Sequence, residues 1–284
     1  IEPSGSEPQE LNDLSAMDQW PFIHCHAHSQ FSILQSTAST QDLISAAVKD
    51  NMPGVALTDM GNMMGAFHFL QQIEQHNKSL TEEDKRPTLK GILGSELNVC
   101  ENHANKNHKD NGYQIVFLAK NKIGYHNLSK LSSLAYTDGF YYLPRVDRRL
   151  VEEYKEGLIV LTGNLYGEVP SKILNVGTNQ AEEALLWWKE IFGDDLYVEI
   201  MRHGQEDEDR VNEVLIDLAK KHQLKVVATN NLFYIDKEDL ERWEYEKGAK
   251  KKTRTKGDFT YQWAEGKINF PDDLTKPSRS EEHT

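Results

Sequence analysis

Short apolar runs alternate with amphipathic segments along most of the chain. The segments at 122–136, 180–192 and 206–223 repeat apolar residues every three or four positions, which predicts helices. Between them, short runs rich in β-branched and other apolar residues predict strands. The seven predicted strands are 22–26, 54–58, 90–99, 113–119, 157–162, 196–201 and 225–229.

The order of these elements favours an α/β fold with a parallel sheet, because strands alternate with helices and the strands are almost continuously apolar. The sequence contains no G-x-G-x-x-G fingerprint and no P-loop motif. We therefore expect a closed barrel rather than a doubly wound sheet. In such a barrel the functional side chains lie at the C-terminal ends of the strands.

Composition and charge narrow the functional classes. A net charge of −13 should repel a nucleic-acid backbone, unless the basic run at 247–256 is a contact rather than a solvated loop. Two cysteines make no disulfide framework, which favours a reducing, cytoplasmic location. Apolar runs are too short for a membrane helix, and residues 1–19 lack the features of a secretory signal and predict a disordered arm.

The stretch HCHAHS at 24–29 carries candidate metal chemistry. Its three histidines stand two residues apart, so in a strand they would all project from one face. Such imidazoles either hold a metal or form ordinary polar contacts. Other polar residues fall in or just after the remaining predicted strands and should share one rim of the barrel: Glu96, Gln114, Asn164, His203 and Asn231.

A series of motifs identifies a related family. FIHCHAHSQFSIL, MPGVALTDMGN, LKGILGSELNV, GYHNLSKLSSLAY, GLIVLTGN, YVEIMRHG and VVATNNLFYI follow one another in the family order. They resemble the PHP (polymerase and histidinol phosphatase) domain at the N-terminus of the bacterial DNA polymerase III α subunit. The resemblance implies a distorted seven-stranded (β/α) barrel of the PHP type at 20–247. The arm at 1–19 precedes it, and a linker or tail toward a polymerase body follows at 248–284.

The resemblance also implies a ligand set. Members of the family bind up to three metal ions at the strand ends and cleave phosphoester bonds. The first ion would be held by His24, His26 and Glu96, with Asn231 where the family has an aspartate. His203 lies near the rim and is a weaker candidate.

The positions for the other two ions have lost their ligands. In this sequence they carry Gln35, Met60, Gln114, Asn164 and Phe233. Amide, thioether and phenyl groups are not usual ligands for these ions. We therefore expect a vestigial site that holds one zinc or manganese ion, or none, and we assign no catalytic residue.

The function implied is that of a scaffold in DNA replication with a degenerate, inactive metal site. Its partners would be the polymerase body of the same chain and, in some members, a proofreading exonuclease. DNA would be bound only through the full-length polymerase, and no membrane is expected. The palm that carries DNA-directed DNA polymerase activity lies further C-terminal in the family. Two alternatives stay open: an active metal-dependent phosphoesterase or 3′–5′ exonuclease, and a free-standing anion-binding protein.

Overall fold

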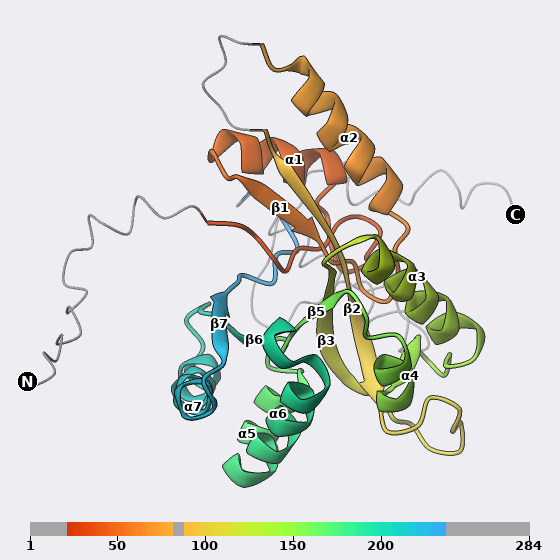
Figure 1. Ribbon diagram of the computed structural model, residues 1–284, viewed down its shortest axis with the longest axis vertical. Helices are drawn as coiled ribbons and strands as arrows, with labels where there is room; N and C mark the ends of the chain where they lie inside the picture. The colour runs from red at the N-terminus through yellow and green to blue at the C-terminus, as the bar shows by residue number, and fades with distance from the viewer. Residues whose placement is uncertain (1–21, 82–87, 237–284) are drawn as a thin grey trace, which may run out of the picture.

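A seven-stranded sheet forms the centre of the protein (Figure 1). The computed structural model describes residues 22–81 and 88–236. The strands are β1 (Gly54–Leu57), β2 (Lys90–Cys100), β3 (Tyr113–Ala119), β4 (Arg145–Asp147), β5 (Leu158–Leu161), β6 (Leu196–Ile200) and β7 (Lys225–Ala228). Neighbours follow the order β1-β2-β3-β5-β6-β7, and β4 pairs with β2. Six of the seven predicted strands are present within one residue of their expected ends.

Helices cover the outside of the curled sheet. Within the described residues they are α1 (Thr40–Lys49), α2 (Ala66–Ser79), α3 (Lys122–Thr137), α4 (Arg148–Glu153), α5 (Glu168–Asn175), α6 (Thr178–Phe192) and α7 (Glu206–His222), with a 3-10 turn η2 (Gly193–Asp195). Figure 1 shows α1 and α2 together beside β1, with α5, α6 and α7 at the opposite end. None of the helices in the described part of the chain is long and apolar enough to cross a membrane.

Local sequence signals explain where two of these helices begin and end. Ser39 and Asp42 form a capping box at the start of α1. The first turn of α7 is acidic and its last turn is basic, an arrangement that the helix dipole favours.

The expectation of an all-parallel sheet is wrong at β3. This strand runs antiparallel to both of its neighbours, β2 and β5. The reason is the connection at 101–112, which contains no helix, whereas a parallel pairing of consecutive strands usually needs a helical crossover. The reversal places the beginning of β3 at the same edge as the end of β2, with Asn98 opposite Gln114.

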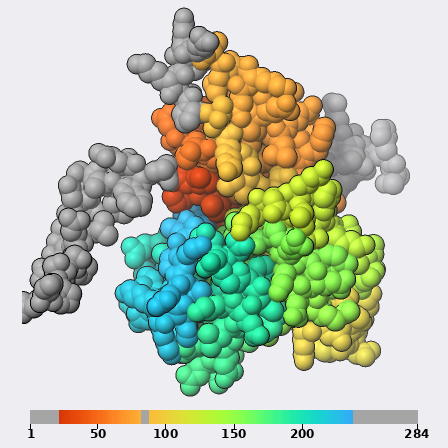
Figure 2. All heavy atoms as spheres, in the orientation of Figure 1, coloured from red at the N-terminus to blue at the C-terminus, as the bar shows by residue number. Residues whose placement is uncertain are grey.

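The predicted strand at 22–26 is also wrong, because this segment forms only isolated bridges. His24 bridges Val55 of β1, and Ala27 bridges Leu232, which follows β7. Backbone hydrogen bonds on both sides, such as Ala56 N to His24 O at 2.8 Å and Leu232 N to His26 O at 3.0 Å, hold it between the two edges of the sheet. The segment therefore joins the edges of the curled sheet, and Figure 2 shows the first described residues, in red, against the blue residues near the end of the described chain.

Three apolar clusters fill the fold. The largest lies between the sheet and helices α3 to α7, and a second lies under α1 and α2. The third contains Ala56, Val116, Leu118 and Leu161 from three strands and fills the inside of the curl. Because side chains alternate along a strand, β2 places Glu96, next to Leu97 of the outer cluster, on the inner face.

Some predicted features lie outside the described residues. These are the arm at 1–19, the tail at 248–284, the basic run at 247–256 and the ends of the 20–247 domain range.

Candidate metal centre

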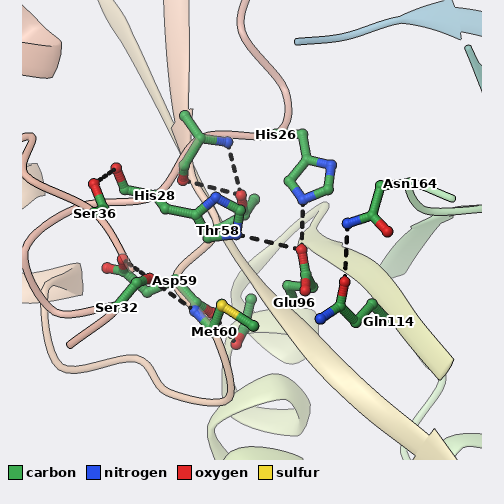
Figure 3. Close-up of polar contacts among 12 residues, drawn as sticks. His26, His28, Ser32, Ser36, Thr58, Asp59, Met60, Glu96, Gln114 and Asn164 are labelled. Atoms are coloured by element: carbon green, nitrogen blue, oxygen red, sulfur yellow. Dashed lines mark hydrogen bonds and ion pairs between the residues drawn. The ribbon is translucent and has the colours of Figure 1, made fainter. Parts of the chain in front are cut away.

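His26, His28 and Glu96 form one buried cluster inside the curl (Figure 3). Their ligand-type atoms lie within 4.8 Å of one another, and each residue is at most 2% exposed. Nε2 of His26 is 2.7 Å from Oε2 of Glu96, and Nε2 of His28 is 3.3 Å from the same oxygen. Within residues 22–81 and 88–236, this is the only such group of three or more His, Cys, Asp or Glu side chains.

The residue between the two histidines is fixed by the neighbouring strand. Ala27 N donates a hydrogen bond to Oγ1 of Thr58 at 2.9 Å, and the same hydroxyl donates to Ala27 O at 3.0 Å. Thr58 follows β1 and is fully buried. These two hydrogen bonds fix the position of both imidazoles relative to Glu96 on the adjacent strand β2.

His26 lies between two carboxylates. Its Nε2 faces Glu96, and its Nδ1 is 2.8 Å from Oε1 of Glu199 on β6. Burial lowers the pKa of His26, but the contacts with Glu199 and Glu96 outweigh burial and raise this pKa to about 10. Burial raises the pKa of Glu96, but the contacts with His26 and His28 outweigh burial and lower this pKa to about 2. In the metal-free protein, a His26 imidazolium is therefore paired with the Glu96 carboxylate.

The donor set also fits a metal ion. Nε2 of His28 is buried and has no hydrogen-bond partner. Its separation of 3.3 Å from Oε2 of Glu96 matches that of two ligands on a tetrahedral zinc ion, about 3.3 Å for bonds of about 2.0–2.1 Å. Two imidazoles and one carboxylate are the protein ligands of many zinc sites, and they also suit manganese. His26, at hydrogen-bond distance, would have to move outward by about half an ångström to join such a shell.

His24, which the sequence analysis placed in the ligand set, does not belong to this cluster, and His28 occupies the place expected for it. The reason is that the segment is not a regular strand, so the alternation that would align three histidines does not hold. His24 is half-buried, and its ring meets the edge of Phe22 with centroids 4.9 Å apart. Burial lowers the pKa of His24, and the charge of Asp50 only partly opposes this.

Most of the predicted rim residues surround one cavity of about 710 Å³. Its wall includes His24, Gln35, Met60, Gln114, Asn164, His203, Asn231 and Phe233, but not Glu96. The described residues of the wall include no lysine or arginine, so they offer no permanent cation to an anion.

Side chains at the positions of the lost ligands contact one another or the cluster. Asn164 Nδ2 donates to Oε1 of Gln114 at 3.0 Å (Figure 3). The ring of Phe233 stacks on His28, with centroids 4.2 Å apart and planes 6° from parallel. Asn231 has a left-handed backbone with φ of 43°, and its Oδ1 is buried without a hydrogen-bond partner.

His203 is not available as a ligand in this arrangement. Its Nδ1 is 2.6 Å from Oε1 of Glu208, and its Nε2 is 2.8 Å from the carbonyl oxygen of Asn230. Burial lowers the pKa of His203, but these two contacts outweigh burial and raise it. The residue therefore ties the start of α7 to the chain after β7.

The sequence analysis missed two buried acidic residues near the cluster. Glu199 is 1% exposed and holds His26, and Asp59 is 1% exposed and accepts hydrogen bonds from Ser29 and Ser32. Glu199 interrupts an apolar strand in LYVEI, and a charged residue in a buried strand is a signal that could have identified it. Asp59 is saturated by these hydroxyl groups and a backbone N–H, which indicates a role in shaping the loop after His28.

The chain is similar in sequence to two bacterial polymerase subunits. The chain is 38% identical over 222 residues to the DNA polymerase III subunit alpha of Borreliella burgdorferi, covering 77% of this chain and 18% of that protein. It is 39% identical over 231 residues to the same subunit of Thermus aquaticus, covering 78% of this chain and 18% of that protein. The chain thus spans about a fifth of the length of these relatives.

Two further comparisons concern the fold and the family. An amidohydrolase structure from Chromobacterium violaceum superposes with a TM-score of 0.49 and 11% identity, covering 79% of this chain and 96% of that one. The family model described as "PHP domain" matches residues 24–203, which include the cluster and the strands that carry it. The chain therefore belongs to the PHP domain family, and its α/β fold is a distorted barrel of the PHP type.

Proposed function

We propose that this chain is the PHP domain of a replicative DNA polymerase III α subunit and acts as a scaffold for the polymerase body. The sequence similarity to α subunits supports this proposal, because it extends over more than three quarters of the chain. The proposed partners are the polymerase body and a proofreading exonuclease, and DNA is contacted through the full-length polymerase.

The single observation that carries the proposal of an inactive site is the composition of the cavity wall. Phosphoester hydrolysis assisted by clustered ions needs a second ion about 3.5–4 Å from the first. The positions around the cluster instead hold Gln114, Asn164, Met60 and Phe233, and the two amides are hydrogen-bonded to each other. These side chains leave the described site with one set of three ligands.

We further propose that this set holds one zinc or manganese ion. His26 and His28 would supply Nε2 atoms, and Glu96 would supply Oε2. The buried, unpartnered Oδ1 of Asn231 is available as a fourth, neutral ligand. A bound ion at this place would polarise a phosphate oxygen or lower the pKa of a water molecule. Without a second ion or a free general base, we expect the ion to stabilise the barrel mouth only.

A second candidate function is a live metal-dependent phosphoesterase. The observation that favours it is the intact cluster of two histidines and a glutamate, which has the composition of a catalytic zinc site. The two proposals make opposite predictions for hydrolysis.

The test uses the whole 284-residue chain with zinc or manganese added. Metal content is measured by mass spectrometry, and hydrolysis is followed with bis(p-nitrophenyl) phosphate and with the 3′ end of single-stranded DNA. We expect up to one bound ion and no turnover above the metal-only blank. Metal-dependent turnover that disappears in His28→Ala would establish the phosphoesterase instead.

The scaffold role has a separate test. The chain and the remaining part of the α subunit from the same organism are produced as two polypeptides and mixed. We expect a stable complex on size-exclusion chromatography and a higher unfolding temperature of the polymerase part. Separate elution of the two parts at micromolar concentration would argue against the scaffold.

A further inference from the structure

In both histidines of the cluster, Nδ1, the ring nitrogen that does not face Glu96, lies next to an oxygen atom. Nδ1 of His26 lies 2.8 Å from Oε1 of Glu199, and Nδ1 of His28 lies 3.2 Å from the carbonyl oxygen of Leu232. A carbonyl oxygen and an ionised carboxylate accept hydrogen bonds and do not donate them. Each Nδ1 must therefore carry the proton, and both Nε2 atoms point toward Glu96.

Glu199 is itself fixed by the sheet. It lies on β6, where it is 1% exposed, and Oγ1 of Thr229 donates to its Oε1 at 2.5 Å. Thr229 follows β7, and its own N–H bonds to the carbonyl oxygen of Ile200 at 3.0 Å. The pairing of β6 with β7 thus sets the position of the oxygen that His26 meets.

Among the described residues, Glu199 forms an ion pair with His26 alone. Its second oxygen, Oε2, is buried without a hydrogen-bond partner. A buried carboxylate that has one cationic neighbour and one oxygen without a hydrogen bond is costly in free energy unless that neighbour needs it.

We propose that Glu199 is a positioning residue that holds His26 in the Nδ1–H tautomer and aims its Nε2 at a metal ion shared with His28 and Glu96. This inference rests on the single-ion site proposed above and adds to it a residue from another strand, β6. A carboxylate behind a ligating histidine fixes the ring and raises its basicity, and its loss weakens metal binding about 10–100-fold. Thr229 donates a hydrogen bond to the same oxygen of Glu199, and its loss should weaken metal binding less.

The test measures the Kd for Zn²⁺ by calorimetry in the parent and in Glu199→Gln. Glutamine keeps the length of the side chain but removes its charge, and its NH₂ group can face His26. We expect a Kd about 10–100-fold higher. The control is Glu182→Gln, which removes a glutamate that contacts His222, 2.5 Å away on the surface of α7, and should leave the Kd for Zn²⁺ unchanged.

Nitrogen-15 NMR of the zinc-loaded protein separates positioning from a merely structural role. In the parent we expect the His26 ring to show a protonated Nδ1 and a zinc-bound Nε2. In Glu199→Gln we expect that pattern to be lost or averaged, while the signals of His28 keep their pattern. If Glu199→Gln does not fold, Thr229→Val removes the supporting hydroxyl with little change of shape, and we expect its Kd to rise a few-fold.

The outcomes distinguish a failure of the metal site from a failure of the positioning role of Glu199. If the parent binds no zinc, or if binding survives His26→Ala with His28→Ala, the metal site fails and the role of Glu199 fails with it. If zinc binding depends on these histidines but Glu199→Gln, or Thr229→Val in its place, keeps the parental Kd and ring pattern, the site stands and the positioning role is overturned.

Discussion

The side-chain amide of Asn164 donates a hydrogen bond to Oε1 of Gln114 at 3.0 Å, and this bond joins the chain after β5 to the start of β3. In a barrel whose strands all ran parallel, the start of a strand would lie far from the ends of the others. The antiparallel direction of β3 brings the two amides to the same edge. There they satisfy each other at positions where the family resemblance implies metal ligands.

This amide pair should behave as one unit in stability measurements. Gln114→Met removes the acceptor and leaves the Asn164 amide unpaired, so we expect a loss of about 1 kcal/mol in the free energy of unfolding. In a double-mutant cycle with Asn164→Ala, the coupling should be about 0.5–1.5 kcal/mol. Urea unfolding of the four proteins measures it. Strictly additive losses would show that the hydrogen bond contributes nothing to stability.

Asn231→Asp should tighten zinc binding. The substitution places a charged oxygen where the neutral Oδ1 is buried and unpartnered. Aspartate tolerates the left-handed backbone at this position as asparagine does. We expect the Kd for Zn²⁺ to fall about tenfold, which corresponds to about 1.4 kcal/mol.

The matched control for this change is Asn230→Asp, which adds the same charge one residue earlier on an exposed side chain. It should change the Kd much less. Equal effects of the two substitutions would mean that the added charge acts at long range and that Asn231 does not face the ion. Neither variant should gain hydrolytic activity, because the other positions still lack ligands.

Arg145 should be essential for stability although it touches no functional group. Its guanidinium is 1% exposed and donates to four carbonyl oxygens, those of Gly139, Asp110, His103 and Asn105. These bonds hold the connection between β2 and β3. Arg145→Met leaves the carbonyl groups unpaired, and we expect a loss of about 3 kcal/mol or more in urea unfolding.

Arg202→Met provides the comparison for that loss. Arg202 is exposed, and its nearest carboxylate, Asp209, is 3.6 Å away. We expect a change below about 0.5 kcal/mol. A similar loss of unfolding free energy in both variants would show that the hydrogen bonds of Arg145 do not stabilise the fold.

Acid should destabilise the protein partly through Glu168. Burial raises the pKa of this carboxyl, but hydrogen bonds from Arg148 and Lys172 outweigh burial and lower it. A group with a lowered folded-state pKa adds stability above its unfolded pKa of about 4.3, and this contribution disappears as the pH falls through the folded pKa. Trp188 also donates its indole N–H to Glu168, at 3.0 Å.

The measurement is the urea midpoint from pH 7 to pH 3. Glu168→Gln should be less stable than the parent at pH 7, and the gap should close below about pH 4. Glu74→Gln is the control, because Glu74 pairs with Lys78 on an exposed helix face. A parallel pH dependence in the parent and Glu168→Gln would contradict the assignment.

The sequence predicted the strands well where a run of apolar residues decided the matter. Six strands are found, because each follows a run of mostly apolar residues; β1, β5 and β6 are largely buried, whereas β7 is largely exposed. The sequence did not predict the antiparallel pairing of β3. It also did not predict β4, whose three residues Arg145–Asp147 include two charged side chains. Long-range contacts form β4, since the buried guanidinium of Arg145 binds carbonyl groups of a distant loop, and no local pattern reports them.

The site was harder to predict than the fold. A two-residue period gives three equivalent histidines, but the chain bends at Cys25 and His26, and this bend separates His24 from the other two. The family resemblance located the rim, and the structure places those residues around one cavity. Glu199 was missed because its importance comes from facing His26 across the barrel, a relationship between residues separated by 173 positions.

The segment that joins the edges of the sheet has a consequence for folding. His28 bonds to Leu232 across 204 positions of the chain, so its neighbours at that edge are made long after it during synthesis. Contacts of such long range slow folding, because the chain must close a large loop before the contact contributes. The helices and the antiparallel pair β2–β3 can form before residues 24–28 bond to Leu232, which follows β7. Occupancy of the metal centre would then report that the domain has closed, and zinc uptake during refolding should follow the slowest phase.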